Sequence, residues 1–247
     1  MEPLFSLQNL TYRYDGGATI FQQFSFSIFP GETVLLTGPN GVGKTTLLHI
    51  ISGLLDKGEL HYQAFYKGNP IQLPDMRAHL SYATSETVMF SKLTGYENIE
   101  CFRLLWKLDR QYVRKAEELC RLLGMEEMLS FPVDQYSLGT RQKLHIAIAL
   151  ARPAELYLLD EPFNSLDMSS RDRLAEWIQC DRQAAYLIAS HVHQERFLDS
   201  RIVSLARPSG GNENGKMTVR SYDEKSSFLI GVIGHFSVAL SSLLCSN

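Results

Sequence analysis

The chain has 247 residues, of which 45% are hydrophobic and 21% charged, so it is long enough to bury the core of one large domain. The formal net charge of -3 offers nucleic acid no bulk electrostatic attraction, and we expect no nucleic-acid partner. The four cysteines lie far apart without metal-ligand spacing, which favours reduced thiols in the cytosol over a disulfide or zinc framework.

The first predicted elements are two strands, at residues 7–14 and 20–29, separated by the turn residues Asp15-Gly16-Gly17. A β-rich apolar run at 33–37 then leads through a glycine-rich loop into a helix at 45–54. Strand, loop and helix in this order are typical of an α/β protein.

Further along, a polar stretch at 93–128 is predicted to be rich in helices. Two apolar strands follow, at 156–159 and 185–189, with a helix at 169–180 between them. Apolar strands that alternate with helices predict a mainly parallel sheet. Residues 209–215 are rich in Gly, Ser and Asn and have the composition of a flexible linker.

The glycine-rich loop, Gly38-Pro39-Asn40-Gly41-Val42-Gly43-Lys44-Thr45, matches the phosphate-binding pattern G-x-x-x-x-G-K-[ST] in its required setting between a strand and a helix. In this pattern backbone N–H groups converge on phosphate oxygens, the lysine reaches the β- and γ-phosphates, and the hydroxyl of Thr45 ligates Mg²⁺. A glycine turn that merely caps a helix explains neither Lys44 nor Thr45. The predicted ATP-binding residues here are Gly38, Asn40, Gly41, Gly43, Lys44, Thr45 and Thr46.

Two carboxylates end the predicted strand at 156–159, at the edge where parallel sheets bind ligands. Asp160 is expected to hold Mg²⁺ and Glu161 to polarise the water that attacks the γ-phosphate. A solvated strand end is the alternative for such a pair taken alone. The phosphate-binding pattern upstream favours a nucleotide site.

Just before that strand, Gln135-Tyr136-Ser137-Leu138-Gly139-Thr140-Arg141-Gln142-Lys143-Leu144 resembles the signature motif of ATP-binding cassette ATPases. The resemblance spans roughly residues 4–205 with all motifs in order. It implies a P-loop NTPase core with a mainly parallel sheet, an N-terminal antiparallel β subdomain and a helical subdomain at about 93–135. The ATPase domain would then cover 1–208, followed by the linker 209–215 and a tail, 216–247, of uncertain role.

In that family two subunits face head to tail, and each ATP lies between one phosphate loop and the opposite signature motif. The resemblance therefore implies that Ser137 and Gly139 contact the γ-phosphate of a partner's ATP, although for Ser137 taken alone a simple helix cap is favoured. Asn164-Ser165-Leu166-Asp167 resembles the loop that runs along the family's dimer interface, and it also has the composition of a plain turn and cap.

Two further residues match family positions. His191, after the apolar run at 186–190, corresponds to the histidine that bonds the γ-phosphate; His193 is the competing histidine, and a surface or core residue is the alternative. Tyr14 lies where the family stacks an aromatic ring on adenine. Tyr12 is the competing ring, and a buried core tyrosine is the alternative for either.

The pattern is broken at two positions. Ser85 stands where the family usually has a glutamine that contacts Mg²⁺ and the attacking water; a serine hydroxyl is still a ligand, but with shorter reach, so we expect atypical coupling or hydrolysis. Leu138 replaces the first glycine of the common signature, a change that we expect to be mild.

Two apolar segments remain open to interpretation. In the helical stretch, Phe102, Leu104, Leu105, Trp106 and Leu108 either receive a helix of a membrane subunit, as in the family, or form the subdomain's own small core. In the tail, residues 226–245 favour a packed C-terminal helix over a membrane span or an unstructured end.

The sequence as a whole predicts the Mg-ATP-hydrolysing subunit of a transporter, working as a homodimer or with a paralogous subunit on a separate membrane-embedded permease. It would be cytoplasmic and peripheral on the inner face of the cell membrane. The signature is closer to those of exporters, so export is the expected direction. The alternatives are a soluble cassette ATPase acting on ribosomes or DNA, and a regulatory nucleotide-binding subunit of low activity.

Overall fold

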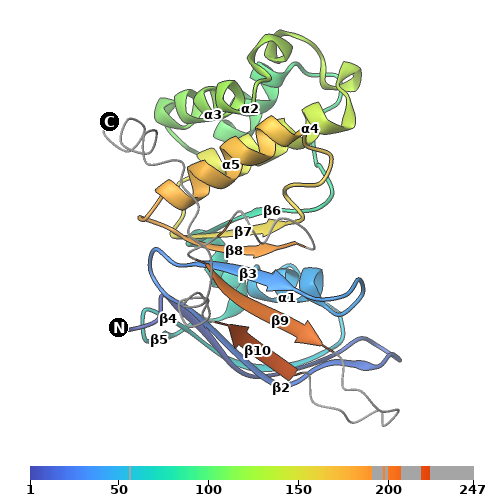
Figure 1. Cartoon of the computed structure of the whole chain (residues 1–247), viewed down its shortest axis with the longest axis vertical. Helices are drawn as coiled ribbons and strands as arrows, with labels where there is room; N and C mark the ends of the chain where they lie inside the picture. Colours follow the sequence, from blue (N-terminus) through green and yellow to red (C-terminus); the bar gives the residue numbers. More distant parts are fainter. Residues whose placement is uncertain (56, 191–196, 198–199, 207–217, 223–247) are drawn as a thin grey trace, which may run out of the picture.

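A computed structural model describes residues 1–55, 57–190, 197 and 200–206, and the backbone of 218–222 (Figure 1). The first sheet has four antiparallel strands in the order β2-β1-β4-β5. Its strands are β1 (Phe5–Arg13), β2 (Thr19–Ile28), β4 (Glu59–Tyr66) and β5 (Asn69–Pro70). The expected N-terminal antiparallel β subdomain is therefore confirmed, and its strands β4 and β5 are ones that the sequence did not predict.

The second sheet has six strands in the order β10-β9-β3-β8-β7-β6. Its strands are β3 (Thr33–Thr37), β6 (Leu80–Ala83), β7 (Leu156–Asp160), β8 (Ala185–Ala189), β9 (Arg201–Ala206) and β10 (Thr218–Tyr222). All neighbours pair in parallel except β10, which is antiparallel to β9. The predicted mainly parallel sheet is thus confirmed, and one of its strands, β10, comes from the segment expected to be a tail.

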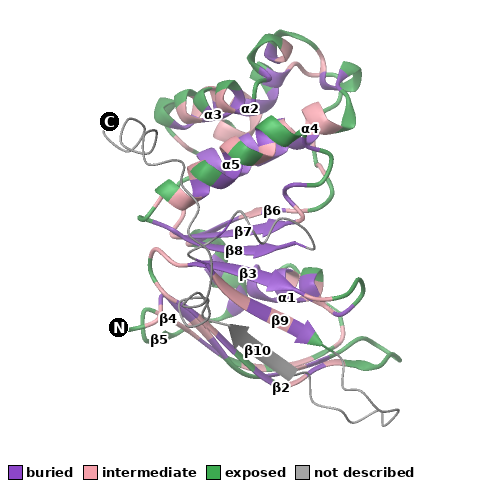
Figure 2. Ribbon diagram, in the orientation of Figure 1, coloured by how far each residue is buried: buried purple, intermediate pink, exposed green. Residues whose placement is uncertain are grey.

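Successive residues of the central strands enter two different hydrophobic cores. On β7, Leu156 and Leu158 belong to the core shared with α1 (Lys44–Ile51) and the antiparallel sheet. Tyr157 and Leu159 belong to the core shared with α4 (Leu138–Ala151) and α5 (Met168–Cys180). Every residue of β3, β7 and β8 is buried (Figure 2). Covering both faces in this way explains why these strands are continuous apolar runs.

The helical subdomain consists of α2 (Gly95–Leu105), α3 (Arg110–Leu122) and the short helices η2 (Glu126–Ser130) and η3 (Val133–Gln135). Earlier in the chain a further short helix, η1 (Leu73–Ala78), precedes β6. The start of α2 is fixed by a capping box between Thr94 and Glu97.

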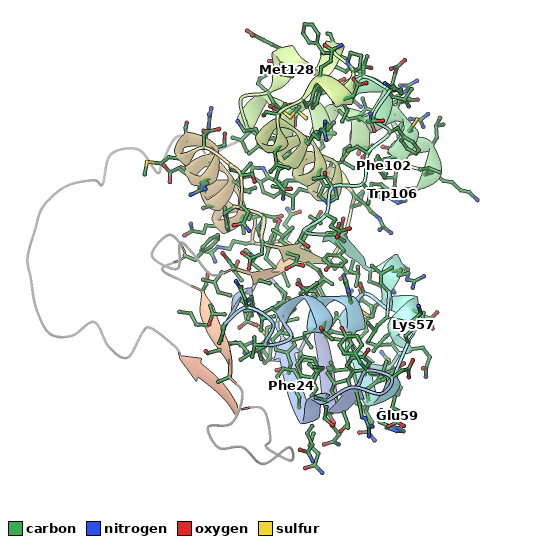
Figure 3. All side chains as sticks on the ribbon, turned by 90° about the vertical axis from the view of Figure 1, so that its right-hand side faces the viewer. Phe24, Lys57, Glu59, Phe102, Trp106 and Met128 are labelled. Carbon is green, nitrogen blue, oxygen red and sulfur yellow. The ribbon has the colours of Figure 1, made fainter. Side chains whose placement is uncertain are left out.

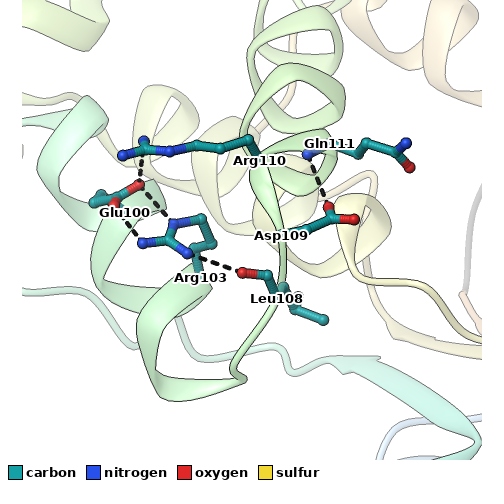
Figure 4. A network of polar contacts seen from close by, with 6 residues as sticks. All are labelled: Glu100, Arg103, Leu108, Asp109, Arg110 and Gln111. Carbon is teal, nitrogen blue, oxygen red and sulfur yellow. Dashed lines mark hydrogen bonds and ion pairs between the residues drawn. The ribbon is translucent and has the colours of Figure 1, made fainter.

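Side-chain bonds hold α2 against α3 (Figure 4). Glu100 accepts hydrogen bonds from Arg103 at 2.7 and 2.9 Å and from Arg110 at 3.1 Å, and Arg103 also donates to the carbonyl of Leu108 at 2.9 Å. One carboxylate therefore ties the middle of α2 to the start of α3.

The structure divides the apolar residues of this stretch between the two interpretations. Phe102, Trp106 and Leu108 pack against the core that α2 and α3 share with α4, α5 and the sheet, with the rings of Phe102 and Trp106 5.1 Å apart (Figure 3). Leu104 and Leu105 are 59% and 63% exposed. The stretch thus packs into a core that it shares with α4, α5 and the sheet, rather than into a small core of its own, and it also leaves two leucines on the surface.

No helix in the described part of the chain is both long and apolar enough to cross a membrane. The linker 209–215 and the apolar segment 226–245 lie outside the described residues.

Candidate functional site

The phosphate-binding pattern forms the loop between β3 and α1, and three of its glycines have left-handed backbones. A Cβ on Gly38, at φ 140°, would lie 2.4 Å from the carbonyl oxygen of Leu205, and one on Gly43, at φ 117°, would lie 2.9 Å from Ile20. Gly41, at φ 73°, faces open space. Glycine at these positions lets the loop turn tightly while it packs against β2 and β9.

The start of α1 is prepared for an anion. Gly43 precedes Lys44 as the cap residue, no side chain caps the helix, and its first turn has no acidic residue. The N–H groups at this end carry the positive pole of the helix, so negative charge is stabilised here.

Lys44 is 6% exposed and lies across its own loop. Its Nζ donates to the carbonyl oxygens of Gly38 at 2.9 Å and Pro39 at 3.3 Å. Burial lowers the pKa of the Lys44 ammonium, and the carboxylates of Glu161 and Asp160 oppose that shift. A buried cation held by neutral carbonyls gains energy from an anionic ligand, which offers charged acceptors.

Thr45 and Asp160 meet at the boundary between the loop and the end of β7. The hydroxyl of Thr45 donates to Oδ2 of Asp160 at 2.8 Å. Asp160 is 1% exposed, and its buried Oδ1 has no hydrogen-bond partner among the described residues. A buried carboxylate is costly unless a cation or donors compensate it. One hydroxyl and one carboxylate are the oxygen ligands that Mg²⁺ prefers, so these residues suit that ion.

Glu161, directly after Asp160, has a left-handed backbone at φ 51°, and its N–H donates to the carbonyl of Ala189 at 2.8 Å. A non-glycine residue in this region is strained, a state common at functional sites. Its side chain lines a pocket of about 430 Å³ that Ser85, Asn164 and Ser165 also line. The structure therefore brings Ser85 beside the predicted base.

The signature residues lie apart from this loop. α1 packs into the core on one face of the six-stranded sheet and α4 into the core on the other (Figure 1). Ser137 is the N-cap of α4, and its Oγ accepts from the N–H of Thr140 at 3.1 Å. A Cβ on Gly139 would lie 2.5 Å from the carbonyl of Ser165. The helix-cap role is therefore real, and within one chain Ser137 and Gly139 do not join Lys44.

The loop at 164–167 also acts as a turn and a cap. Ser165 has φ 63°, and Asp167 is the N-cap of α5, accepting from the N–H of Ser170 at 2.9 Å. Asp167 forms an ion pair with Lys143 of α4 at 2.7 Å. The signature helix and this loop are thus held together.

Of the two competing tyrosines, only Tyr14 presents an accessible ring. Tyr12 is fully buried and donates to the carbonyl of Lys57 at 2.9 Å. Tyr14 is 40% exposed, packs edge-on against Tyr12 and bonds the hydroxyl of Thr46 at 3.1 Å. The exposed ring therefore lies beside the phosphate loop. His191 and His193 lie outside the described residues.

Two residues near the acids were not singled out from the sequence. Tyr82, on β6, has a buried hydroxyl without a hydrogen-bond partner among the described residues, and burial followed by the charge of Asp160 raises its pKa. Gln142, on α4, lines the pocket of Glu161. The available signals were positional: Tyr82 lies within the segment aligned for Ser85, and Gln142 within the signature-like run.

The comparisons with known proteins identify the family of the chain. Residues 21–164 match the family model described as ABC transporter. The molybdate/tungstate import ATP-binding protein WtpC of Thermococcus kodakarensis is 34% identical over 172 residues, 68% of this chain and 51% of that protein. The cytochrome c biogenesis ATP-binding export protein CcmA of a Chelativorans species is 35% identical over 178 residues, covering 72% of this chain and 86% of that protein.

A solved structure described as the ATP-binding subunit of an ABC transporter superimposes with a TM-score of 0.70 at 27% identity, covering 81% of this chain and 85% of the other. The chain spans about half the length of the WtpC proteins that it matches. The family model matches more than half of the chain, and the CcmA relative is 35% identical over 72% of it, so the chain belongs to the ABC transporter family.

Proposed function

We propose that this chain binds Mg-ATP and hydrolyses it to drive a membrane transporter. The contact between Thr45 and Asp160 carries the proposal, because it joins a hydroxyl and a carboxylate next to the phosphate loop and leaves one buried carboxylate oxygen open to a cation. Bound Mg²⁺ would neutralise charge on the β- and γ-phosphates.

The other residues have distinct roles in this proposal. Lys44 leaves its loop carbonyls for the β- and γ-phosphate oxygens, and the ring of Tyr14 stacks on adenine. Glu161 holds the attacking water and polarises it, and Ser85 adds a hydroxyl to the Mg²⁺ or the water from the same pocket. His191 bonds the γ-phosphate.

Dimerisation belongs to the same proposal. Ser137 and Gly139 begin a helix packed on the opposite face of the sheet from α1, so one chain cannot close both motifs around one nucleotide. In a head-to-tail pair, from identical or paralogous chains, each signature motif meets the partner's ATP.

The proposed partner is a membrane-embedded permease that holds this chain at the cytoplasmic face of the membrane. Leu104 and Leu105 offer an exposed apolar contact on the helical subdomain, 93–135. We propose export as the direction of transport, because the signature resemblance favours it and the relative CcmA is named an export protein. Recovery of a hydrophobic multi-span protein with the chain from membranes supports transport, whereas recovery of RNA or DNA supports a soluble ATPase.

The test of hydrolysis is Glu161→Gln. Removing the base should lower turnover by about 10²–10⁴ while ATP still binds and a dimer accumulates on size exclusion. Glu176→Gln, at an exposed position of α5, is the matched control and should hydrolyse at the wild-type rate. Unchanged turnover in Glu161→Gln would remove Glu161 from its role, and a wild type that binds Mg-ATP without hydrolysing it would favour a regulatory subunit.

A further inference from the structure

The pocket beside Glu161 joins three parts of the chain. Ser85 enters it from the segment after β6, Glu161 from the end of β7, and Gln142 from the second turn of α4. The volume is about 430 Å³. Since a water takes up about 30 Å³ in the liquid, the pocket has room for ordered water between these side chains.

Gln142 is the unusual member of this set. It is only 6% exposed, yet its carboxamide makes no hydrogen bond with any residue in the described part of the chain. Its amide atoms are not among the fully enclosed polar atoms that lack a partner, so the opening left to them is the pocket they line. The carboxamide can therefore find its hydrogen-bond partners only in the pocket, and an apolar side chain would be favoured at this position if packing were its only role.

The same face of α4 also contacts the segment that carries Ser85. His145, one turn after Gln142, is 8% exposed, and its Nε2 lies 3.5 Å from the hydroxyl of Thr84. Burial lowers the pKa of His145 to about 4, so the ring is neutral at neutral pH. Thr84 in turn donates to the carbonyl of Glu86 at 2.6 Å. The residue before Ser85 therefore lies against α4.

We propose that Gln142 is a positioning residue of the ATPase site: its carboxamide, together with the hydroxyl of Ser85, orients the water held by Glu161. This inference depends on the proposed hydrolysis. The amide supplies both a donor and an acceptor, which matches a water bridged to a carboxylate and a hydroxyl. The side chain of Ser85 is short, so the longer side chain of Gln142 on α4 reaches the water from the other side of the pocket.

The test is Gln142→Met, which keeps an unbranched side chain and removes both hydrogen-bonding groups. We expect kcat for ATP to fall about tenfold while KM and Mg-ATP affinity stay within twofold of wild type. The thermal unfolding midpoint should be equal or higher, since the removed amide makes no hydrogen bond with the described residues. Gln142→Leu must give the same kcat loss, and Gln179→Leu on α5, outside the pocket, is the control with wild-type kcat.

A double-variant cycle tests the pairing with Ser85. The kcat loss of Ser85→Ala combined with Gln142→Met should be smaller than the product of the two single losses, because both variants release the same water. The inference is overturned if kcat is unchanged in the Gln142 variants. It is also overturned if activity is lost only through a higher KM or a lower unfolding midpoint, or if the kcat losses of the two single variants multiply in the double variant.

A parallel assay of Glu161→Gln distinguishes failure of this inference from failure of the proposed function. If wild-type hydrolysis depends on Glu161 but not on Gln142, only the inference fails. If Glu161→Gln is as active as wild type, the proposed function fails first.

Discussion

The two carboxylate oxygens of Asp160 have different surroundings. One carboxylate oxygen accepts from Thr45, while the other is buried without a partner among the described residues. Without ligand, this charge costs folding energy; the Mg²⁺ that we propose beside it would compensate the charge. The folded chain is therefore less stable at this point than it would be with a neutral side chain.

Asp160→Asn should separate these two effects. The amide keeps an oxygen for Thr45 but loses the charge, so the ligand-free variant should be as stable as wild type or more stable by about 1 kcal/mol. Affinity for Mg-ATP should fall about 10- to 100-fold, equivalent to about 1.4–2.7 kcal/mol. Titration with ATP in the presence and absence of Mg²⁺, and thermal unfolding without nucleotide, measure both. An equal loss of affinity with and without Mg²⁺ would contradict the assignment of Asp160 to the metal.

At the same scale, local spacing in the sequence predicted which residues lie together at the candidate site. Lys44, Thr45 and Asp160 follow from a loop pattern and a strand end, and the structure brings all three together. Tyr82 and Gln142 were missed because the burial of a side chain depends on which elements pack against it. Tyr12 and Tyr14 share a face by period two, yet their exposures differ, since β1 ends at Arg13 and Tyr14 lies beyond the sheet.

At the scale of elements, the ion pair between Lys143 and Asp167 joins the signature helix α4 to the start of α5. The Lys143 ammonium, and next the N–H of Ser170, hold the pKa of the Asp167 carboxyl well below its usual range. A depressed pKa stabilises the fold at pH values above the unfolded-state pKa of about 4, and this contribution is lost as the pH falls further.

Asp167→Asn should reveal the charge term alone, because asparagine caps a helix about as well as aspartate. The Asp167 side chain is 55% exposed, so solvent screening limits the expected loss to about 0.5–1 kcal/mol at pH 7. Urea unfolding at pH 7, 5 and 3 should show this difference shrinking below about pH 4.

Asp109→Asn provides the matched comparison, since Asp109 caps α3 through the N–H of Gln111 and forms no ion pair within the described residues (Figure 4). The ion pair contributes nothing if the loss of unfolding free energy in Asp167→Asn stays constant down to pH 3. The same conclusion follows if that loss is no larger than the loss in Asp109→Asn.

Elements buried on both faces were the most predictable. For β3 and β8 the predicted and observed limits coincide, because each strand is a continuous apolar run between clear breaks. The strand β4 has only one fully buried residue, Ala64, so its pattern in the sequence is weak. β10 follows a linker-like segment, and only its pairing with β9 identifies it as part of the sheet.

At the scale of the whole molecule, the six-stranded sheet separates two hydrophobic cores, one on each of its faces. One core contains the antiparallel sheet and α1, and the other contains α2–α5. Trp106 and Trp177, the only two tryptophans of the chain, both pack against the second core. Their fluorescence therefore reports on the helical side, whereas circular dichroism reports on both sides.

Leu158 and Leu159 make a matched pair for testing whether the cores unfold together. They are consecutive on β7, identical in type and fully buried, but Leu158 faces the first core and Leu159 the second. Each change to alanine should cost about 2–5 kcal/mol, from lost burial and the cavity left behind. Because both cores share the sheet, we expect them to unfold together in urea. Leu158→Ala should then lower the urea midpoint measured by tryptophan fluorescence as far as Leu159→Ala does. It should lower the midpoint measured by circular dichroism by the same amount as the fluorescence midpoint. If Leu158→Ala moved the circular dichroism midpoint and left the tryptophan midpoint unchanged, the two cores would be separate folding units.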